Sequence, residues 1–222
     1  SSELDTKENH ERFFAGIPNI PKAKKESMAI YLMFLQHIMF SLSARGKAAI
    51  VVPTGFITAQ SGIERKIREQ MVERKMLRGV VSMPSNIFAT TGTNVSILFL
   101  DKENNKGDIV LMDASKLGTT VKEDKNQKTL LSPTEEDYII TTFNNHEAKE
   151  DFSVVVSYED IKAKNYSLSA GQYFEVKIEY TEITPVEFAT KMKTFESNLS
   201  ELFAESKTLE MEIKNNLKGL KY

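Results

Sequence analysis

The sequence contains no cysteine and only three histidines among its 222 residues. Without cysteine the chain forms no disulfide and has no thiolate chemistry, and a reducing compartment such as the cytoplasm is the location we expect. His10, His37 and His146 are too far apart in the sequence to indicate a metal site. Lys and Arg total 29 against 31 for Asp and Glu, a formal net charge of −2, so overall charge does not indicate nucleic-acid binding.

Common catalytic signatures are also missing. The chain has no Walker loop, no zinc-ligand spacing, no G-x-S-x-G elbow and no G-x-G-x-x-G after a strand. The neighbouring carboxylates Glu135, Glu136 and Asp137 fall at a predicted helix start, where the helix dipole explains them without catalysis. The most apolar stretch, 28–42, is about fifteen residues and too short to span a bilayer, so we interpret it as a buried helix and expect no membrane segment.

The pattern that is present is that of an α/β fold. The composition, 41% hydrophobic and 27% charged, fits one sizeable globular domain, alone or with an appendage. Short apolar runs bounded by turn residues predict strands at 47–52, 77–83, 94–100 and 108–112. Amphipathic segments predict helices at 27–44, capped by Ser27, and at 61–75. The last strands follow too closely for helical crossovers, so we expect an antiparallel pair at the sheet edge.

The region that follows mixes loop, helix and strand. The polar stretch 116–131 is predicted to be a loop. A helix is predicted from Ser132 to about Lys149, because Ser132, Pro133 and Glu135 form the pattern of a capping box with proline in the first turn. Beyond it we expect a strand, a helical turn and an extended segment, at 152–157, 158–162 and 166–173.

The end of the chain predicts one long amphipathic helix, from Pro185 to Leu220. Its apolar residues recur every seven positions in two interleaved series, which Ser206 and Asn216 interrupt. The members are Phe188, Met192, Phe195, Leu199, Leu202, Leu209, Ile213 and Leu220. Such a seam either folds back on its own domain or forms a coiled coil with another subunit, and a helix of roughly 50 Å favours the second.

Two loops that follow predicted strands are the candidate binding site, because open α/β sheets bind ligands beyond the carboxyl ends of their strands. They are 52–56 (VPTGF) and 84–94 (PSNIFATTGTN). Phe88 in the second loop either offers a stacking face to a planar ligand or caps the core. A cluster of basic residues, Arg65, Lys66 and Arg68, either contacts phosphates or forms a solvated face of mixed charge.

The combination of the two loops resembles a known family. The run 46–102, which contains VVPTGF and NIFATTGTNVSILFL, is similar to the modification subunits of type I restriction–modification systems, which are DNA adenine-N6 methyltransferases. HERFFAGIPN, KNQKTLLSPTEEDYIITTF and FSVVVSYEDIKAKNYSLSAGQYF extend the resemblance over about residues 10 to 175. It implies the carboxy-terminal half of a Rossmann-like, S-adenosylmethionine-dependent fold, in which 47–52 is the fifth strand and 77–83 and 94–100 are the final antiparallel pair.

The resemblance also implies a division of labour. The family's glycine-rich cofactor loop and its Asn-Pro-Pro-Phe motif, which binds the target amine, are absent, so we expect no catalytic residue and no metal in this chain and an isolated chain that is inactive. The chain would instead supply walls for a flipped adenine, with Phe88 stacked on the base. The other expected pocket residues are Pro53, Thr54, Gly55, Thr91, Gly92 and Asn94.

Four regions are expected on this basis. They are an irregular lead-in at 1–26, the second half of the methyltransferase domain at 27–115, a mixed α/β extension at 116–184 and an assembly helix at 185–222. The helix would bind the specificity subunit, which selects the DNA sequence and works with a restriction subunit. The alternatives are a piece of a fused restriction–methylase or another phage-defence methyltransferase, and a non-catalytic assembly module. Because the chain starts with Ser1 rather than Met, we expect a piece of a longer protein.

Overall fold

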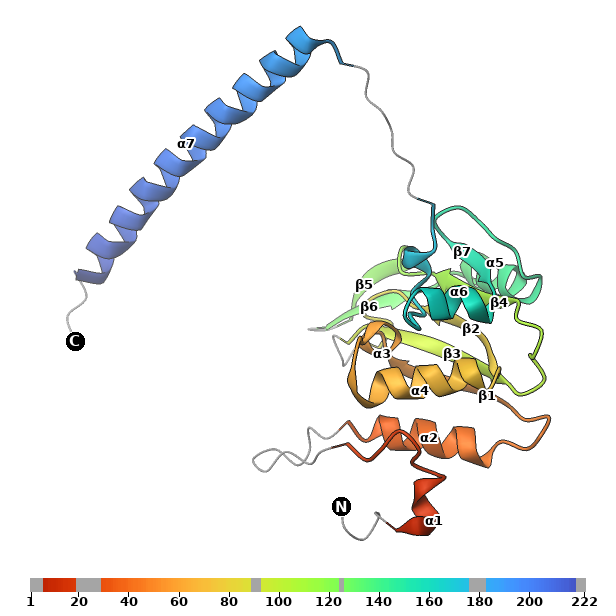
Figure 1. Cartoon of the computed structure of the whole chain (residues 1–222). Coiled ribbons are helices and arrows are strands. Elements are labelled where there is room, and N and C mark those ends of the chain that lie inside the picture. Colours follow the sequence, from red (N-terminus) through yellow and green to blue (C-terminus); the bar gives the residue numbers. More distant parts are fainter. Residues whose placement is uncertain (1–5, 19–28, 89–92, 124–125, 176–182, 219–222) are drawn as a thin grey trace. The chain divides into compact units, whose positions relative to one another are not determined.

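A five-stranded sheet organises the first of two structural units. The computed structural model describes residues 6–18, 29–88, 93–123, 126–175 and 183–218, and they divide into the units Ser1–Glu175 and Val176–Tyr222 (Figure 1). The strands of the large sheet are β1 (Lys47–Pro53), β2 (Leu77–Ser82), β3 (Val95–Asp101), β4 (Ile109–Asp113) and β7 (Ser153–Val156). The mixed α/β fold predicted from the sequence is confirmed.

The strand order is β1-β3-β2-β4-β7. β3 runs antiparallel to both β1 and β2, β2 is parallel to β4, and β7 is antiparallel to β4. The predicted antiparallel pairing of β2 with β3 is therefore confirmed, but its position at the sheet edge is wrong. β3 lies inside the sheet because both of its edges are paired, and its seven residues are all buried or half-buried.

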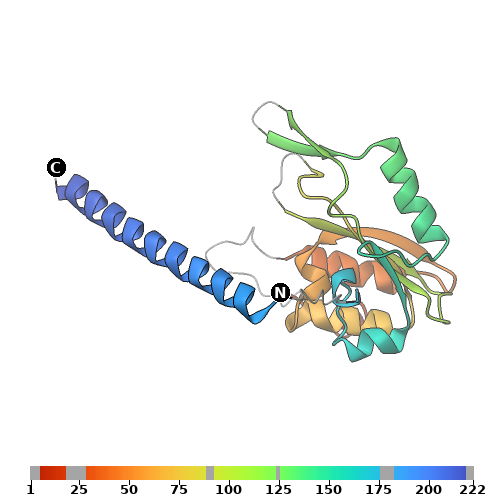
Figure 2. The same ribbon diagram turned by 90° about the horizontal axis from the view of Figure 1, so that it is seen from above.

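Helices cover both faces of this sheet (Figure 2). The larger core joins one sheet face to α2 (Tyr31–Ser41), α4 (Gly62–Glu73) and α6 (Tyr158–Ala163). The smaller core joins the opposite face to α5 (Pro133–Asn144), where the Phe143 ring lies against β2. Gly79 permits this contact, since a Cβ there would stand 2.6 Å from the Phe143 ring. Alternate residues of β2, β3 and β4 thus face different cores.

The predicted loop at 116–131 is wrong, because two short strands, β5 (Thr119–Glu123) and β6 (Asn126–Leu130), form a separate hairpin there. The segments TTVKE and NQKTL carry too few apolar residues to show a strand pattern. Cross-strand pairing and a hydrogen bond of 3.2 Å between the Thr120 and Thr129 hydroxyls hold the hairpin together. Main-chain pairing, which leaves no trace in composition, accounts for the missed element.

The extended segment predicted at 166–173 is also wrong. Asn165 and Tyr166 both have positive φ, and the Tyr166 amide donates to the Ile161 carbonyl, so the chain turns sharply after α6. A short 3₁₀ helix follows at Ala170–Gln172. Two further short helices are α1 (Lys7–His10) and α3 (Gly55–Thr58).

Helix boundaries depend on local hydrogen bonds. The predicted capping box of α5 is confirmed: the Glu135 amide donates to the Ser132 hydroxyl, and the Ser132 amide donates to the Glu135 carboxylate. The helix ends at Asn144, short of the predicted Lys149, because the chain turns with a positive φ at His146. Ser27, the predicted cap of the preceding long apolar helix, lies outside the described residues.

The described residues of the second unit, 183–218, contain one helix, α7 (Pro185–Lys218), which is 34 residues long and was predicted from the heptad pattern. Its start is capped by Thr184, whose hydroxyl accepts from the Glu187 amide while the Glu187 carboxylate accepts from the Thr184 amide. None of its side chains is buried, so the apolar seam is open to solvent along its described length. In the described parts of the chain, no helix is long and apolar enough to cross a membrane.

Candidate functional site

The two candidate loops meet at the carboxyl ends of β1 and β2. The Thr54 amide, just after β1, donates a 2.8 Å hydrogen bond to the Asn94 carbonyl, at the end of the second loop. On the other side of that loop the Thr129 amide of β6 donates to the Asn86 carbonyl at 2.9 Å. Figure 1 shows α3 and the β5–β6 hairpin at this same edge of the sheet. The expected juxtaposition of the two loops is therefore present in the fold.

A row of hydroxyl groups crosses three strands beneath these loops. The Thr54 and Ser96 hydroxyls lie 3.1 Å apart, and the Ser96 hydroxyl lies 3.4 Å from that of Ser82. Ser96 is fully buried in β3, opposite Val52 on one side and Ser82 on the other. This row was not predicted from the sequence, although a serine within the apolar strand VSILFLD was a visible signal. The row satisfies its own polar groups and joins the ends of β1, β3 and β2.

The expected pocket residues differ in their exposure. Phe88 is 48% exposed although it is aromatic, and Gly55 and Asn94 are exposed as well. Pro53 and Thr54 are half-buried, as expected for residues that begin a loop directly from a strand. A Cβ on Gly55 would meet no atom within 4 Å, so there is open space beside it. Thr91 and Gly92 lie outside the described residues.

Arg68 is not a phosphate contact, and this expectation is corrected. Its side chain is fully buried in α4, and its guanidinium donates to the carbonyls of Phe56, Ala59 and Tyr166. Burial, followed by the nearby charge of Arg65, lowers the pKa of Arg68 to about 10, which still leaves it protonated at neutral pH. The planar fork of five N–H donors suits such a set of carbonyl acceptors. Arg68 thus holds the segment after β1 against the segment after α6.

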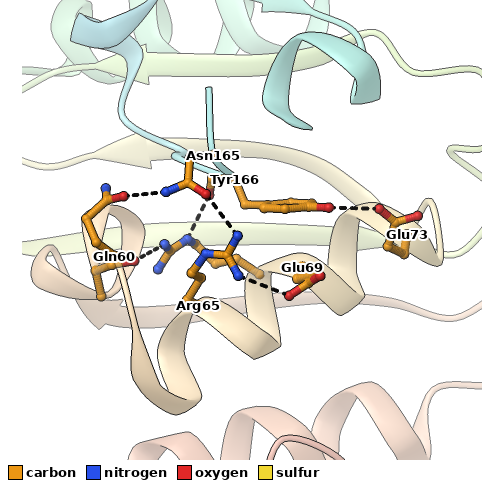
Figure 3. Close-up of polar contacts among 8 residues, drawn as sticks. Gln60, Arg65, Glu69, Glu73, Asn165 and Tyr166 are labelled. Atoms are coloured by element: carbon orange, nitrogen blue, oxygen red, sulfur yellow. Dashed lines mark hydrogen bonds and ion pairs between the residues drawn. The ribbon is translucent and has the colours of Figure 1, made fainter. Parts of the chain in front are cut away.

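The neighbouring side chains reinforce the same junction. Arg65 donates to the Asn165 side chain at 2.9 Å, forms an ion pair with Glu69 and lies over the Tyr166 ring (Figure 3). Two further hydrogen bonds lie at this junction. The Asn165 side-chain amide donates to the Gln60 side chain at 2.6 Å, and the Tyr166 hydroxyl donates to the Glu73 carboxylate at 3.1 Å. Lys66 is exposed and makes none of these contacts. Two of the three basic residues expected to contact phosphates, Arg65 and Arg68, therefore bind other segments of the protein instead.

The site shows no donor set for a metal ion. Within the described ranges, no three His, Asp or Glu side chains come together in a way that could hold one. The strand ends carry hydroxyl, amide and aromatic groups, which suit a planar polar ligand better than a cation.

The sheet order and the loops at its carboxyl ends define the class: a Rossmann-like α/β fold. A type I restriction–modification methyltransferase subunit from Streptococcus thermophilus matches with a TM-score of 0.59 at 22% identity, over 72% of this chain and 36% of that one. A chain from a type I restriction–modification complex matches with a TM-score of 0.54 at 18% identity, over 94% of this chain and 44% of that one. These similarities show the fold, as predicted.

The particular family follows from the sequence comparisons. The N-6 DNA Methylase family model matches residues 2–182, and this chain belongs to that family. The type I restriction enzyme MpnII methylase subunit of Mycoplasma pneumoniae is 31% identical over 191 residues, and the HindI methylase subunit of Haemophilus influenzae is 30% identical over 193. These matches cover 86% and 85% of this chain, which spans only 33% and 43% of the two relatives. The resemblance noted in the sequence is confirmed.

Proposed function

We propose that this chain is the target-base and assembly portion of a DNA adenine-N6 methyltransferase of a type I restriction–modification system. The observation that carries the proposal is the pair of hydrogen-bonded loops at the carboxyl ends of β1 and β2, in a chain of the N-6 DNA methylase family. Within it, 27–115 forms the second half of the catalytic domain, 116–184 an extension and 185–222 the helix for assembly. The seam on α7 then binds the specificity subunit, and a restriction subunit completes the system.

S-adenosylmethionine is the methyl donor in this proposal, and its site lies mainly outside this chain. The described strand ends do not fit the cofactor by themselves, because the loops after β1 and β2 contain no carboxylate that could bind ribose hydroxyls. The residues present fit a nucleobase better. We therefore assign to this chain the walls of the base pocket rather than the binding of the cofactor.

The proposed contribution of this chain is to hold the target base outside the duplex. An adenine stacked in DNA cannot present its amine to a methyl donor, so the nucleotide is extruded into a pocket. Phe88, held half-exposed next to Asn86, offers one ring face to that base. Stacking on an aromatic ring contributes about 1–3 kcal/mol per base. Thr54 and Asn94, joined through their main chains, form the adjoining wall.

The proposal is tested by replacing Phe88 in the full-length protein assembled with its partner subunits. Phe88→Ala should lower kcat/KM for DNA by about tenfold or more, in proportion to the lost stacking, while Phe88→Trp should keep most of the activity. The melting temperature should stay unchanged, because Phe88 is not part of either core. Unchanged methylation kinetics for Phe88→Ala would contradict the role given to this ring.

A second candidate function, that of a non-catalytic assembly module, is favoured by one observation. The seam of α7 is exposed along its described length, as expected of a helix that awaits a partner. Methyl transfer to DNA by the full-length protein, measured with labelled S-adenosylmethionine, separates the two candidates. If the protein assembled with its partner subunits but transferred no methyl group, the assembly-module function would be the one that remains.

A further inference from the structure

We infer that the β5–β6 hairpin is a contact for the phosphate backbone of duplex DNA beside the proposed base pocket. This inference rests on the proposed function and assigns to the enzyme a DNA contact outside the pocket itself. The hairpin was predicted to be a loop, so no role followed for it from the sequence. Its position, its charge and its exposed side chains together support the role.

The position of the hairpin is set by two attachments at its base. The Thr129 amide of β6 donates to the Asn86 carbonyl, so the hairpin lies directly against the loop that carries Phe88. The Gly118 amide donates at 2.7 Å to the Glu135 carboxylate at the start of α5. Figures 1 and 2 show the hairpin extending from the sheet at the side of these loops. A duplex that presents a base to Phe88 therefore passes close to the hairpin.

The charge of this region is opposite to that of the whole chain. Residues 116–131 contain four lysines and two acidic residues, a balance of +2, whereas the chain carries −2. Duplex DNA carries one negative charge per about 1.7 Å of its axis, so a local positive excess is what a backbone contact needs. The net charge of the whole chain, which is close to zero, does not reveal this local positive charge.

The strand register gathers polar donors on one face of the hairpin. Lys122 pairs with Gln127, and Thr120 pairs with Thr129, and residues paired in this way share a face. Lys122 and Gln127 are exposed, while Thr129 at the base is buried. An ammonium and a side-chain amide next to each other are typical donors to phosphate oxygens. The fixed base and exposed outer pair let the hairpin set the distance between the backbone and the pocket.

The test measures the binding of a fluorescent mixed-sequence DNA duplex to the full-length protein over a series of salt concentrations. The variants are Lys122→Gln, Lys122→Arg and Gln127→Lys. Lys106→Gln is the matched control, because Lys106 is an exposed lysine in the turn between β3 and β4, at the other end of these strands. Melting temperatures and methyl transfer are measured on the same preparations.

Each lost phosphate contact lowers the slope of log affinity against log salt by about 0.9. We expect that change for Lys122→Gln, a similar increase for Gln127→Lys, and wild-type slopes for Lys122→Arg and Lys106→Gln. Wild-type slopes in both Lys122→Gln and Gln127→Lys would overturn the inference. So would a loss of subunit assembly at unchanged DNA binding, which would make the hairpin a protein contact.

Failure of the proposed function has a different signature. If the wild-type protein bound DNA with the expected slopes but transferred no methyl group to adenine, the methyltransferase assignment would fail while the DNA contact remained. If it methylated DNA and all the variants bound alike, only the hairpin inference would fail.

Discussion

At the scale of single residues, buried hydrogen-bonding groups explain more of this fold than surface charges do. Arg68 satisfies three main-chain carbonyls from two distant segments, and Tyr158, also buried, contacts the carbonyls of Leu77 and Asn104 through its hydroxyl. Burial raises the pKa of Tyr158 to about 12, so it remains a neutral donor throughout the physiological range. A side chain that pairs several buried carbonyls is costly to remove, because each orphaned group loses its partner.

Arg68→Met should destabilise the fold by about 3–5 kcal/mol, because three main-chain carbonyls would lose a donor at about 1–3 kcal/mol each. Arg68→Lys should recover only part of this loss, since an ammonium cannot reproduce the planar fork. Arg65→Met is the comparison on the same helix; its ion pair with Glu69 and its hydrogen bond to Asn165 are partly or fully exposed, so the loss should be smaller, about 1 kcal/mol. Urea denaturation gives the three values, and equal losses for Arg68→Met and Arg65→Met would refute the role of Arg68.

Glu135 makes the base of the hairpin sensitive to acid. Hydrogen bonds from the amides of Ser132 and Gly118 lower its pKa, so the ionised form is favoured in the folded state. Its stabilising effect is therefore fully present above the unfolded pKa of about 4.3 and is lost as the pH falls through the lower folded value.

The amide resonance of Gly118 should accordingly titrate with a midpoint below about 4.3 in an NMR pH series. Glu135→Gln should abolish this titration. Glu136→Gln, one position along the same helix turn, should leave it unchanged because Gly118 donates to Glu135. A midpoint at or above the unfolded value would contradict the direction of the shift.

At the scale of elements, the sequence predicted those whose apolar side chains recur at regular spacing. β1, β2, β3, β4, α4 and α7 all lie within a few residues of their expected positions. The β5–β6 hairpin was missed because the one side chain that it buries, among the described residues, is the polar Thr129. Its sequence therefore shows no regular spacing of apolar residues. The two loops of the site were found from their place after strands. Arg68 was misjudged because a basic residue on a charged helix gives no sign of burial.

The seam of α7 should be required for assembly with the specificity subunit. Leu199→Asp combined with Leu202→Asp places two charges in the seam, where packing against a partner helix would bury them at high cost. Complex formation, followed by size-exclusion chromatography with light scattering, should be lost in this variant.

The control for this experiment is Ser197→Asp, since position 197 belongs to neither apolar series of the seam. It should assemble like the wild-type protein. Normal assembly of the Leu199→Asp, Leu202→Asp variant would rule out the seam as the binding surface. Deletion of residues 185–222 provides an independent check with the same expected loss.

At the scale of the whole molecule, the chain spans a minor share of the relatives it matches, and one end of its sheet is open. β1 is the end strand of the described sheet, and its residues Ala49 and Val51 are exposed, the latter at 50%. An exposed apolar edge strand is unusual in a finished domain. We therefore propose that another polypeptide segment covers this strand.

Val51→Asp distinguishes a covered strand from an exposed one. In the isolated chain the substitution should change the free energy of unfolding by no more than about 0.5 kcal/mol, as for an ordinary surface position. In the full-length protein it should cost several-fold more, because the carboxylate would be buried. Thermal denaturation of both forms is the measurement, and equal effects would show that β1 stays uncovered.

The junction held by Arg68 also ties the end of the first unit to the loop after β1. Arg68 and Tyr166 are 98 positions apart in the chain, yet one hydrogen bond joins them, and the Leu168 amide is bonded to the Ile57 carbonyl of α3. Residue 175, which precedes the unit containing α7, lies only a few positions beyond Leu168. Leu168 is itself part of the larger core, so the end of the first unit and the loop after β1 are fastened both to each other and to that core. Pulling the segment after α6 away from the fold would therefore have to break the same Arg68 hydrogen bonds that position the loop after β1.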